Sequence, residues 1–232
     1  MNLFCVGISH HTADVETRER FAGHAAIDRI LREEVGCSEA LLLTTCNRVE
    51  VYAAAAEPVP TERIAQCLHA KGATPGGDEL EAFYRHEAER CVQHLFRVAS
   101  GLDSMVIGET EILGQAKKAY AAARESGAVG PYLHRLFQRA FRVAKQVRTH
   151  TEISRGAVSV GSVAVELAEQ IFGHFETRKV LLLGAGEASE RTARALVRRG
   201  VSDIRVSNRS LEHAETLATM VGGRWVHGAP PW

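Results

Sequence analysis

Two short segments of this sequence combine residue types that can do chemistry. In the first, Cys46 precedes Asn47 and Arg48 in the link between two apolar runs, at 40–44 and 49–55. These runs predict two strands, and asparagine favours a turn between them. A thiol at an exposed turn beside a guanidinium can ionise to the thiolate, which is the nucleophilic form of cysteine. Spacing alone leaves a reactive Cys46 and an inert turn cysteine as equal alternatives.

The second segment is a glycine turn between a predicted strand at 180–183 and a predicted helix at 187–199. Gly184 and Gly186 supply two glycines of a dinucleotide-binding turn, and Ser189 stands where the third is usual. Glycines at this point let backbone N–H groups and the helix N-terminus approach a pyrophosphate. A further strand at 204–207 and a helix at 211–220 complete a Rossmann-like βαβα unit.

The end of that second strand indicates which dinucleotide the unit prefers. An NAD enzyme usually places Asp or Glu there to bind the ribose 2′-hydroxyl. This chain instead has Ser207, Asn208, Arg209 and Ser210. A guanidinium beside hydroxyl groups suits a 2′-phosphate, so NADPH is the predicted cofactor. The alternative is that Arg209 is a solvated turn residue and that the glycine turn has only a packing role.

The other cysteines and a histidine pair are predicted to be structural. Cys5 lies in an apolar run typical of a buried strand, and Cys67 and Cys91 lie in helical patterns. The five cysteines show no C-x-x-C spacing, which argues against a disulfide framework and a structural zinc site. His10 and His11 have no third ligand at a suitable spacing, so we expect structure or pocket lining and no metal site.

The hydrophobic pattern predicts the scaffold that must position these segments. A strand at 2–8, a helix at 24–35 and the strand pair indicate a small α/β layer over residues 1–75. Helices are then predicted at 87–100, 109–126, 131–150 and 159–172. We therefore predict an α/β protein in two parts. Residues 1–160 form an α/β domain whose residues 80–160 are a helical bundle half, and residues 161–232 form a linking helix and a partial Rossmann-like unit.

The composition fits a folded protein without a membrane span. The 232 residues are 45% hydrophobic and 24% charged, which excludes disorder and collagen-like repeats. The 28 basic and 28 acidic residues balance, so nucleic acid would have to bind a local patch. The N-terminus lacks the basic region of a signal peptide, and no run of about 18 apolar residues occurs. With this cysteine pattern, the chain is expected to be cytoplasmic.

Several motifs, in order along the chain, resemble those of the glutamyl-tRNA reductase family. They are GISHHTA at 7–13, TTCNRVE at 44–50, GLDSMVIGE at 101–109, ILGQ at 112–115 and GAGE at 184–187. The resemblance runs in one register from the N-terminus to about residue 222. It implies a catalytic domain that binds glutamyl-tRNA, followed by an NADPH-binding domain.

The resemblance also implies a two-step reaction. Cys46 attacks the acyl carbonyl of glutamate esterified to tRNA. NADPH then reduces the thioester to glutamate-1-semialdehyde, the first committed step towards tetrapyrroles. Covalent capture divides the reaction into easier steps, and a thioester accepts hydride better than an oxygen ester. Only the γ-carboxylate of the esterified glutamate is free, and the Arg48 guanidinium suits it.

Further site residues follow from the same motifs. Those expected to hold the substrate are Thr45, Asn47, Arg48, Ser104, Glu109 and Gln115. Those expected to hold the cofactor are Gly184, Ala185, Gly186, Glu187, Ser189, Ser207, Asn208 and Arg209. His94 matches an active-site histidine that assists proton transfer, with a packed helix histidine as the alternative. Asn47 could equally be only a turn former.

A basic segment offers the RNA contact that such a substrate needs. Between residues 130 and 155 the only acid is Glu152, against Arg135, Arg139, Arg142, Lys145, Arg148 and Arg155. The first three arginines are spaced i, i+4, i+7 and share a helical face that could lie along RNA phosphates. A solvated or interdomain face is the alternative.

Members of the family are longer than this chain. They continue through the rest of the nucleotide domain and a helical dimerisation domain, so the homodimer contacts of the family are not expected here. We therefore expect a truncated product, or a shortened homologue with an incomplete NADPH-binding domain. Two alternatives to the full reductase remain. The chain only forms and hydrolyses the Cys46 thioester, or it is a non-catalytic tRNA- or partner-binding remnant.

Overall fold

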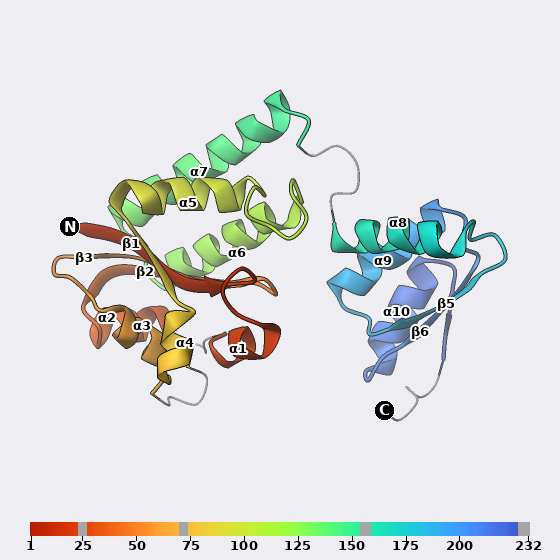
Figure 1. Cartoon of the computed structure of the whole chain (residues 1–232), viewed down its shortest axis with the longest axis horizontal. Coiled ribbons are helices and arrows are strands. Elements are labelled where there is room, and N and C mark those ends of the chain that lie inside the picture. Colours follow the sequence, from red (N-terminus) through yellow and green to blue (C-terminus); the bar gives the residue numbers. More distant parts are fainter. Residues whose placement is uncertain (23–26, 70–73, 154–158, 227–232) are drawn as a thin grey trace. The chain divides into compact units, whose positions relative to one another are not determined.

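The chain divides into two compact units, Met1–Ser154 and Arg155–Trp232 (Figure 1). The computed structural model describes residues 1–22, 27–69, 74–153 and 159–226 of them. Each unit has its own sheet and its own buried core. The mixture of helices and strands confirms the predicted α/β fold class.

The first unit is built on a four-stranded antiparallel sheet in the order β2-β3-β1-β4. The strands are β1 (Asn2–Ser9), β2 (Cys37–Thr44), β3 (Arg48–Ala55) and β4 (Tyr84–Glu87). β3 lies between β2 and β1, and all eight of its residues are buried. Its pairing with β1 runs from Ser9 opposite Arg48 to Asn2 opposite Ala55. Side chains alternate between faces along a strand, so this sheet must be covered on both sides.

Two separate cores cover those two faces. On one face Cys5, Leu43 and Tyr52 pack against three long helices. These are α5 (Ala88–Ala99), α6 (Glu111–Glu125) and α7 (Pro131–His150). On the other face Phe4 and Val51 pack against shorter helices. These include α2 (Ile27–Glu33) and α3 (Thr61–Leu68), and α1 (Val15–Arg20) and α4 (Gly77–Glu81) complete the unit.

Most of the predicted elements are present, and the differences concern short ones. No helix bounds were predicted between the strand pair and residue 87, whereas Pro60 is the N-cap of α3 and α4 follows. Pro at a helix start costs little because its missing N–H would have no partner there. β4 was not predicted either, because four residues show too little alternation. Of the predicted helix 24–35, the part at 24–26 lies outside the described residues.

The second unit is a helix followed by a three-stranded parallel sheet in the order β5-β6-β7. Its elements are α8 (Val160–Phe172), β5 (Lys179–Leu183), α9 (Glu187–Arg198), β6 (Asp203–Ser207), α10 (Leu211–Met220) and β7 (Arg224–Trp225). A helix connects each pair of neighbouring parallel strands, α9 between β5 and β6 and α10 between β6 and β7. The predicted strand–turn–helix order around the glycine turn is confirmed.

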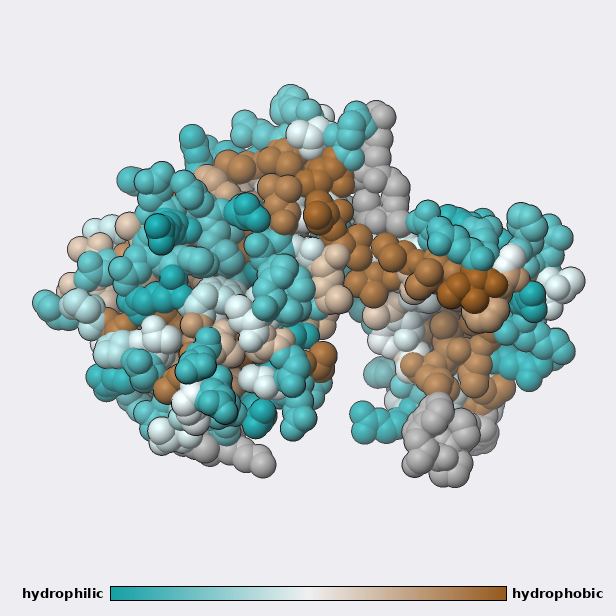
Figure 2. Space-filling model, in the orientation of Figure 1, coloured by the Kyte–Doolittle hydropathy of each residue, from teal (hydrophilic) through white to brown (hydrophobic). Residues whose placement is uncertain are grey.

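α8 presents apolar side chains to the surface of this unit. The exposed ones are Val160, Val163, Leu167, Ile171 and Phe172. Figure 2 shows them as a hydrophobic band over this helix. Even so, none of the helices in the described ranges has the length and hydrophobicity needed to cross a bilayer.

Candidate active site

The link between β2 and β3 is a turn fixed by hydrogen bonds. The Thr45 N–H donates to the Arg48 carbonyl oxygen at 2.9 Å. The Thr45 hydroxyl oxygen accepts from the N–H groups of Asn47 and Arg48, each at 3.1 Å. The Arg18 Nε donates to the Cys46 carbonyl oxygen at 3.2 Å. The backbone of the turn is therefore held in place, while Cys46 itself is exposed.

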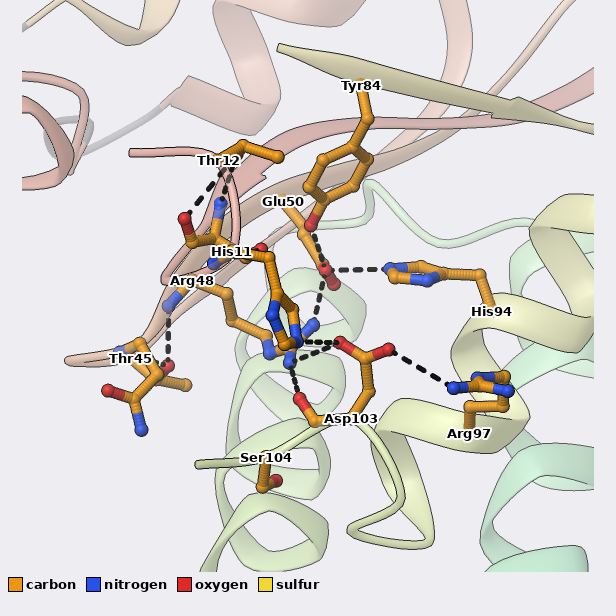
Figure 3. Close-up of polar contacts among 12 residues, drawn as sticks. His11, Thr12, Thr45, Arg48, Glu50, Tyr84, His94, Arg97, Asp103 and Ser104 are labelled. Carbon is orange, nitrogen blue, oxygen red and sulfur yellow. Dashed lines mark hydrogen bonds and ion pairs between the residues drawn. The ribbon is translucent and has the colours of Figure 1, made fainter. Parts of the chain in front are cut away.

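The Arg48 side chain differs from the sequence-based expectation. It was expected as a cation available at the turn beside the thiol, yet it is only 1% exposed. Its Nη1 lies 2.7 Å from Glu50 Oε1, and its Nη2 lies 3.1 Å from Asp103 Oδ1 (Figure 3). Nη2 also donates to the Asp103 carbonyl oxygen. Arg48 is the first residue of a fully buried strand, and a buried guanidinium needs such partners.

Glu50 is the centre of a buried hydrogen-bond network. Besides Arg48, its carboxylate accepts from Tyr84 at 2.5 Å, from Tyr52 at 2.7 Å and from His94 Nε2 at 2.8 Å. Burial alone would raise the pKa of Glu50, but the Arg48 charge and the hydrogen bond from His94 outweigh it and hold the pKa well below its usual range. Glu50 is therefore a buried ionised carboxylate with four donors around it.

His94 comes from α5 and points at this carboxylate (Figure 3). An ionised carboxylate can only accept a hydrogen bond, so Nε2 of His94 carries a proton. In the neutral ring Nδ1 is then the nitrogen that can take up a proton. The ring also packs edge-on to Tyr84 at a centroid distance of 5.4 Å and lies 4.5 Å from the His86 ring. The His94 ring is therefore held in one orientation.

Asp103 is the second carboxylate on the Arg48 guanidinium. It also lies 3.8 Å from His11 Nε2 and 3.8 Å from Arg97 Nη2. Partial burial raises the pKa of Asp103, but the Arg48 hydrogen bond and charge outweigh this and lower it. Its side chain is 17% exposed, whereas that of Glu50 is fully buried. Solvent therefore reaches Asp103 but not Glu50, and the Arg48 guanidinium between them is almost fully buried.

Asp103 belongs to residues 101–110, which we call the 101–110 loop and which joins α5 to α6. Within it the Ser104 hydroxyl donates to Glu109 Oε1 at 3.1 Å. The Glu109 carboxylate also accepts from the Glu111 N–H at 2.7 Å, at the N-terminus of α6, where an anion is favoured. Arg148 of α7 donates to the Glu109 carbonyl oxygen at 3.0 Å. Ser104 and Glu109 are thus brought together, while Gln115 is half-buried on α6.

Gly108 closes the 101–110 loop against residues that follow α7. Its φ is +83°, and an added Cβ would lie 1.8 Å from the Ile153 carbonyl oxygen. We expect Gly108→Ala to lower the free energy of unfolding by about 3 kcal/mol or more, through strain and steric overlap. Gly127 has φ +72° with open space around it, so Gly127→Ala should cost only about 1–2 kcal/mol. Denaturant unfolding of both variants tests this, and equal losses would contradict the close approach.

One group of potential metal ligands occurs among the described residues. The ligand atoms of Cys5, Glu50 and His94 lie within 4.8 Å of one another. Burial and the neighbouring Glu50 charge raise the pKa of the Cys5 thiol well above its usual value, so this thiol stays protonated. The Arg48 guanidinium already neutralises Glu50. We interpret the trio as part of the hydrogen-bond network, because a protonated thiol beside a fixed cation is a poor cation site.

In the second unit, the ends of β5 and β6 meet at the glycine turn. The Gly184 N–H donates to the Ser207 carbonyl oxygen at 2.7 Å, and Gly184 has φ +100°. Gly186 caps α9 with no side chain over it, and a Cβ there would meet nothing within 4 Å. The Ser189 hydroxyl lies 3.6 Å from the position of a Gly184 Cβ, so a serine is accommodated where the third glycine is usual.

The remaining predicted cofactor residues lie at or just after the ends of β5 and β6. Ala185 lies in the turn, and the Glu187 carboxylate is paired with Arg191 on α9. The Asn208 side-chain amide donates to the Ser210 carbonyl oxygen at 3.1 Å, which shapes the turn after β6. Arg209 in that turn is exposed. The N-terminus of α9 and the exposed Arg209 guanidinium are groups that can each bind a phosphate.

Comparison with known proteins identifies the family of this chain. Residues 6–151, more than half of the chain, match the family described as glutamyl-tRNAGlu reductase, N-terminal domain. The chain belongs to the glutamyl-tRNA reductase family. Residues 166–228 match a second family, shikimate / quinate 5-dehydrogenase. The resemblance seen in the ordered motifs is thereby confirmed.

Individual glutamyl-tRNA reductases agree with this assignment. The chain is 46% identical to the protein from Akkermansia muciniphila over 97% of its own length and 67% of that relative. It is 47% identical to the one from Rubrobacter xylanophilus, covering 53% of it. The solved structure of glutamyl-tRNA reductase from Methanopyrus kandleri aligns with a TM-score of 0.66 and 42% identity, over 97% of this chain and 53% of that one. The chain thus spans about half to two thirds of these relatives.

Some residues of this reductase-family site were missed by the sequence analysis. Glu50, Tyr84 and Asp103 were not singled out, although Glu50 and Asp103 stand inside the quoted motifs. A signal existed for Glu50: positions 48, 50 and 52 share one face of a strand, so a buried Arg48 would need an acid two residues away. Arg18, which contacts the Cys46 carbonyl, gave no such signal because it lies 28 residues away.

Proposed function

We propose that this chain forms a thioester between Cys46 and the glutamyl group of glutamyl-tRNA and reduces it to glutamate-1-semialdehyde. The observation that carries the proposal is the exposed Cys46 on a turn whose backbone is fixed, two residues before Arg48, which begins the Arg48–Glu50–His94 network. Membership of the glutamyl-tRNA reductase family supports the substrate and the product. The proposed reaction thus supplies a precursor of tetrapyrroles.

In the acylation step, the Cys46 thiolate attacks the ester carbonyl carbon. A carbon–sulfur bond forms, the carbon–oxygen bond to the tRNA breaks, and the terminal ribose oxygen leaves and takes up a proton. His94 is a candidate carrier of that proton: with its Nε2–H donated to Glu50, Nδ1 takes up the proton that the Cys46 thiol loses and then gives it to the ribose oxygen. Thr45 and Asn47 contribute through the shape of the turn, and Ser104 through the neighbouring loop.

Arg48 is the proposed partner of the substrate's γ-carboxylate. One edge of the guanidinium is taken by the fully buried Glu50. The other edge faces Asp103, whose side chain is partly exposed. We infer that the γ-carboxylate approaches from the Asp103 side and shares or replaces that contact. A planar guanidinium can bind two carboxylates through different N–H pairs.

The second unit is proposed to bind NADPH. The turn at Gly184 and Gly186 with the α9 N-terminus fits the pyrophosphate, and Ser207, Asn208 and Arg209 fit the 2′-phosphate. When bound, NADPH supplies the hydride that converts the thioester into the aldehyde and frees the thiol. The match to shikimate / quinate 5-dehydrogenase supports a dinucleotide-binding unit, and the preference for the phosphorylated form rests on the Arg209 end.

The test is to incubate the chain with tRNA carrying labelled glutamate, in parallel with NADPH, with NADH and with neither, and to separate the products. We expect semialdehyde with NADPH and much less with NADH. Free glutamate without semialdehyde, released faster than by the Cys46→Ser chain, would show that Cys46 is acylated but that the chain acts only as a thioesterase. Intact glutamyl-tRNA in every sample would contradict the proposed reaction.

A further inference from the structure

α7 carries a row of exposed cationic side chains. Arg135, Arg139, Arg142 and Lys145 are all exposed. Within the ranges that the structure describes, none of the four has an ion-pair partner, in contrast to Arg48 and Arg97. Four unpaired cations along one helix repel one another, so an anionic partner would be favoured there.

Two hollows lie along this row. The first, between α5 and α7, has a volume of about 560 Å³. Its apolar wall includes Val92, Phe96, Tyr132 and Leu136, and Arg135 and Arg139 complete the lining. The second has a volume of about 630 Å³ and is lined by polar groups that include His134, Gln138 and Arg142, again with Arg135 and Arg139. The same two arginines therefore stand between an aromatic hollow and a polar one.

This combination of groups matches the chemistry of RNA. Guanidinium groups bind phosphates, and aromatic side chains pack on bases and ribose. The cationic row continues beyond the hollows through Arg142 and Lys145. A short acidic peptide seated in the aromatic hollow would leave those two charges unmatched, whereas a polyphosphate backbone would follow the whole row. The structure therefore favours RNA over an acidic protein segment.

The same helix also reaches the candidate active site. At its other end Arg148 donates to the Glu109 carbonyl oxygen and so contacts the 101–110 loop that carries Ser104 and Asp103. Arg148 lies 13 positions after Arg135 on α7, which corresponds to roughly 20 Å of helix. A rigid element thus links the cationic row to the loop, over a distance that a tRNA acceptor arm can cover.

We propose that the exposed face formed by Arg135, Arg139, Arg142 and Lys145 of α7, with the hollow shared with α5, binds the tRNA body. This inference rests on the proposed function, since the aminoacylated end must lie at Cys46. In this proposal the α7 face provides affinity for the tRNA and orients it, and the turn that carries Cys46 provides the nucleophile.

The experiment measures binding of uncharged tRNA to the full chain at several salt concentrations. Arg135→Glu/Arg139→Glu is compared with Arg29→Glu/Arg32→Glu, which makes the same charge change on α2, across the sheet from α7. We expect the α7 variant to bind about tenfold more weakly or worse, with a salt slope reduced by roughly 1.4–1.8, because each lost phosphate contact removes about 0.7–0.9. The α2 variant should bind within about twofold of the unmodified chain.

Equal affinity and slope in the two variants would overturn the proposal. Competition by a polyglutamate peptide as effective as by tRNA would also overturn it, in favour of an acidic protein partner. Circular dichroism checks folding, and Arg135→Gln/Arg139→Gln repeats the test without introducing acids.

A small glutamyl thioester that lacks RNA separates this proposal from the proposed function. If the unmodified chain accepts that glutamyl group on Cys46 but the α7 charges do not matter for tRNA, only the surface assignment fails.

Discussion

We expect Cys46→Ser to abolish the covalent glutamyl adduct and to lower the rate of glutamyl transfer by about 10⁴-fold or more. The reason is that the thiolate is a far better nucleophile at neutral pH than a serine hydroxyl that has no dedicated base. Intact-protein mass spectrometry after incubation with glutamyl-tRNA, without NADPH, measures the adduct directly. Peptide mapping of the unmodified chain should then locate the glutamyl group on Cys46.

Cys67→Ser is the matched control, and it should retain the adduct. Cys67 is half-buried, and burial together with the Glu34 charge raises the pKa of its thiol. Burial also raises the pKa of Cys37 to about 11 and, with Glu50, that of Cys91 to about 12. These thiols are protonated and shielded at neutral pH. A glutamyl adduct that survives in Cys46→Ser would contradict the assignment of the nucleophile.

The elements of this fold were largely predictable because most of them are long and strongly periodic. α7 was predicted at 131–150, and the structure has Pro131–His150. The short elements were not, and β4 is the clearest case. Its four residues are a strand only because β1 provides a neighbour, with Phe4 opposite Glu87. A tertiary contact, rather than local pattern, decides such a segment.

The candidate site was predictable only in its local part. The turn at Cys46 follows from two strands and an asparagine, and the structure contains that turn. The partners of Arg48 do not follow, because Asp103 lies 55 residues away and His94 lies 44 residues from Glu50. A sequence pattern shows which groups are present, but burial decides whether a charged group faces water or another charge. Arg48 was therefore expected as a cation at the turn and is found between two carboxylates.

The burial of that charge network predicts a large effect at Glu50. Glu50→Gln should lower the free energy of unfolding of the first unit by about 3–5 kcal/mol, because the Arg48 guanidinium loses its buried counter-charge. All four tyrosines of the chain lie in Met1–Ser154 and both tryptophans lie after it. Tyrosine near-ultraviolet circular dichroism therefore follows the first unit in a denaturant titration, and tryptophan fluorescence follows the second. We expect only the tyrosine transition to shift.

The pH dependence of the same variant provides a second readout. The folded-state pKa of Glu50 lies below its unfolded value of about 4.3, so its ionisation stabilises the fold above that pH. This contribution is lost as the pH falls through the folded-state pKa. The unmodified chain should therefore lose stability more steeply than Glu50→Gln between about pH 5 and pH 2. Parallel curves would show that the carboxylate is not ionised in the folded chain.

Glu39→Gln is the control for Glu50→Gln, because it removes a buried carboxylate that lies outside the Arg48–Glu50–His94 network. Glu39 is also buried and also lies on the sheet, but its oxygens accept the N–H groups of Tyr132 at 3.0 Å and Leu133 at 2.7 Å at the start of α7. We expect Glu39→Gln to lower the free energy of unfolding by about 1 kcal/mol, as loss of a helix cap does. The variant should leave acylation of Cys46 by a small glutamyl thioester unchanged. Glu50→Gln should slow the same acylation, because both the guanidinium that receives the γ-carboxylate and the His94 ring lose the group that orients them. Equal acylation rates in the two variants would limit Glu50 to a role in stability.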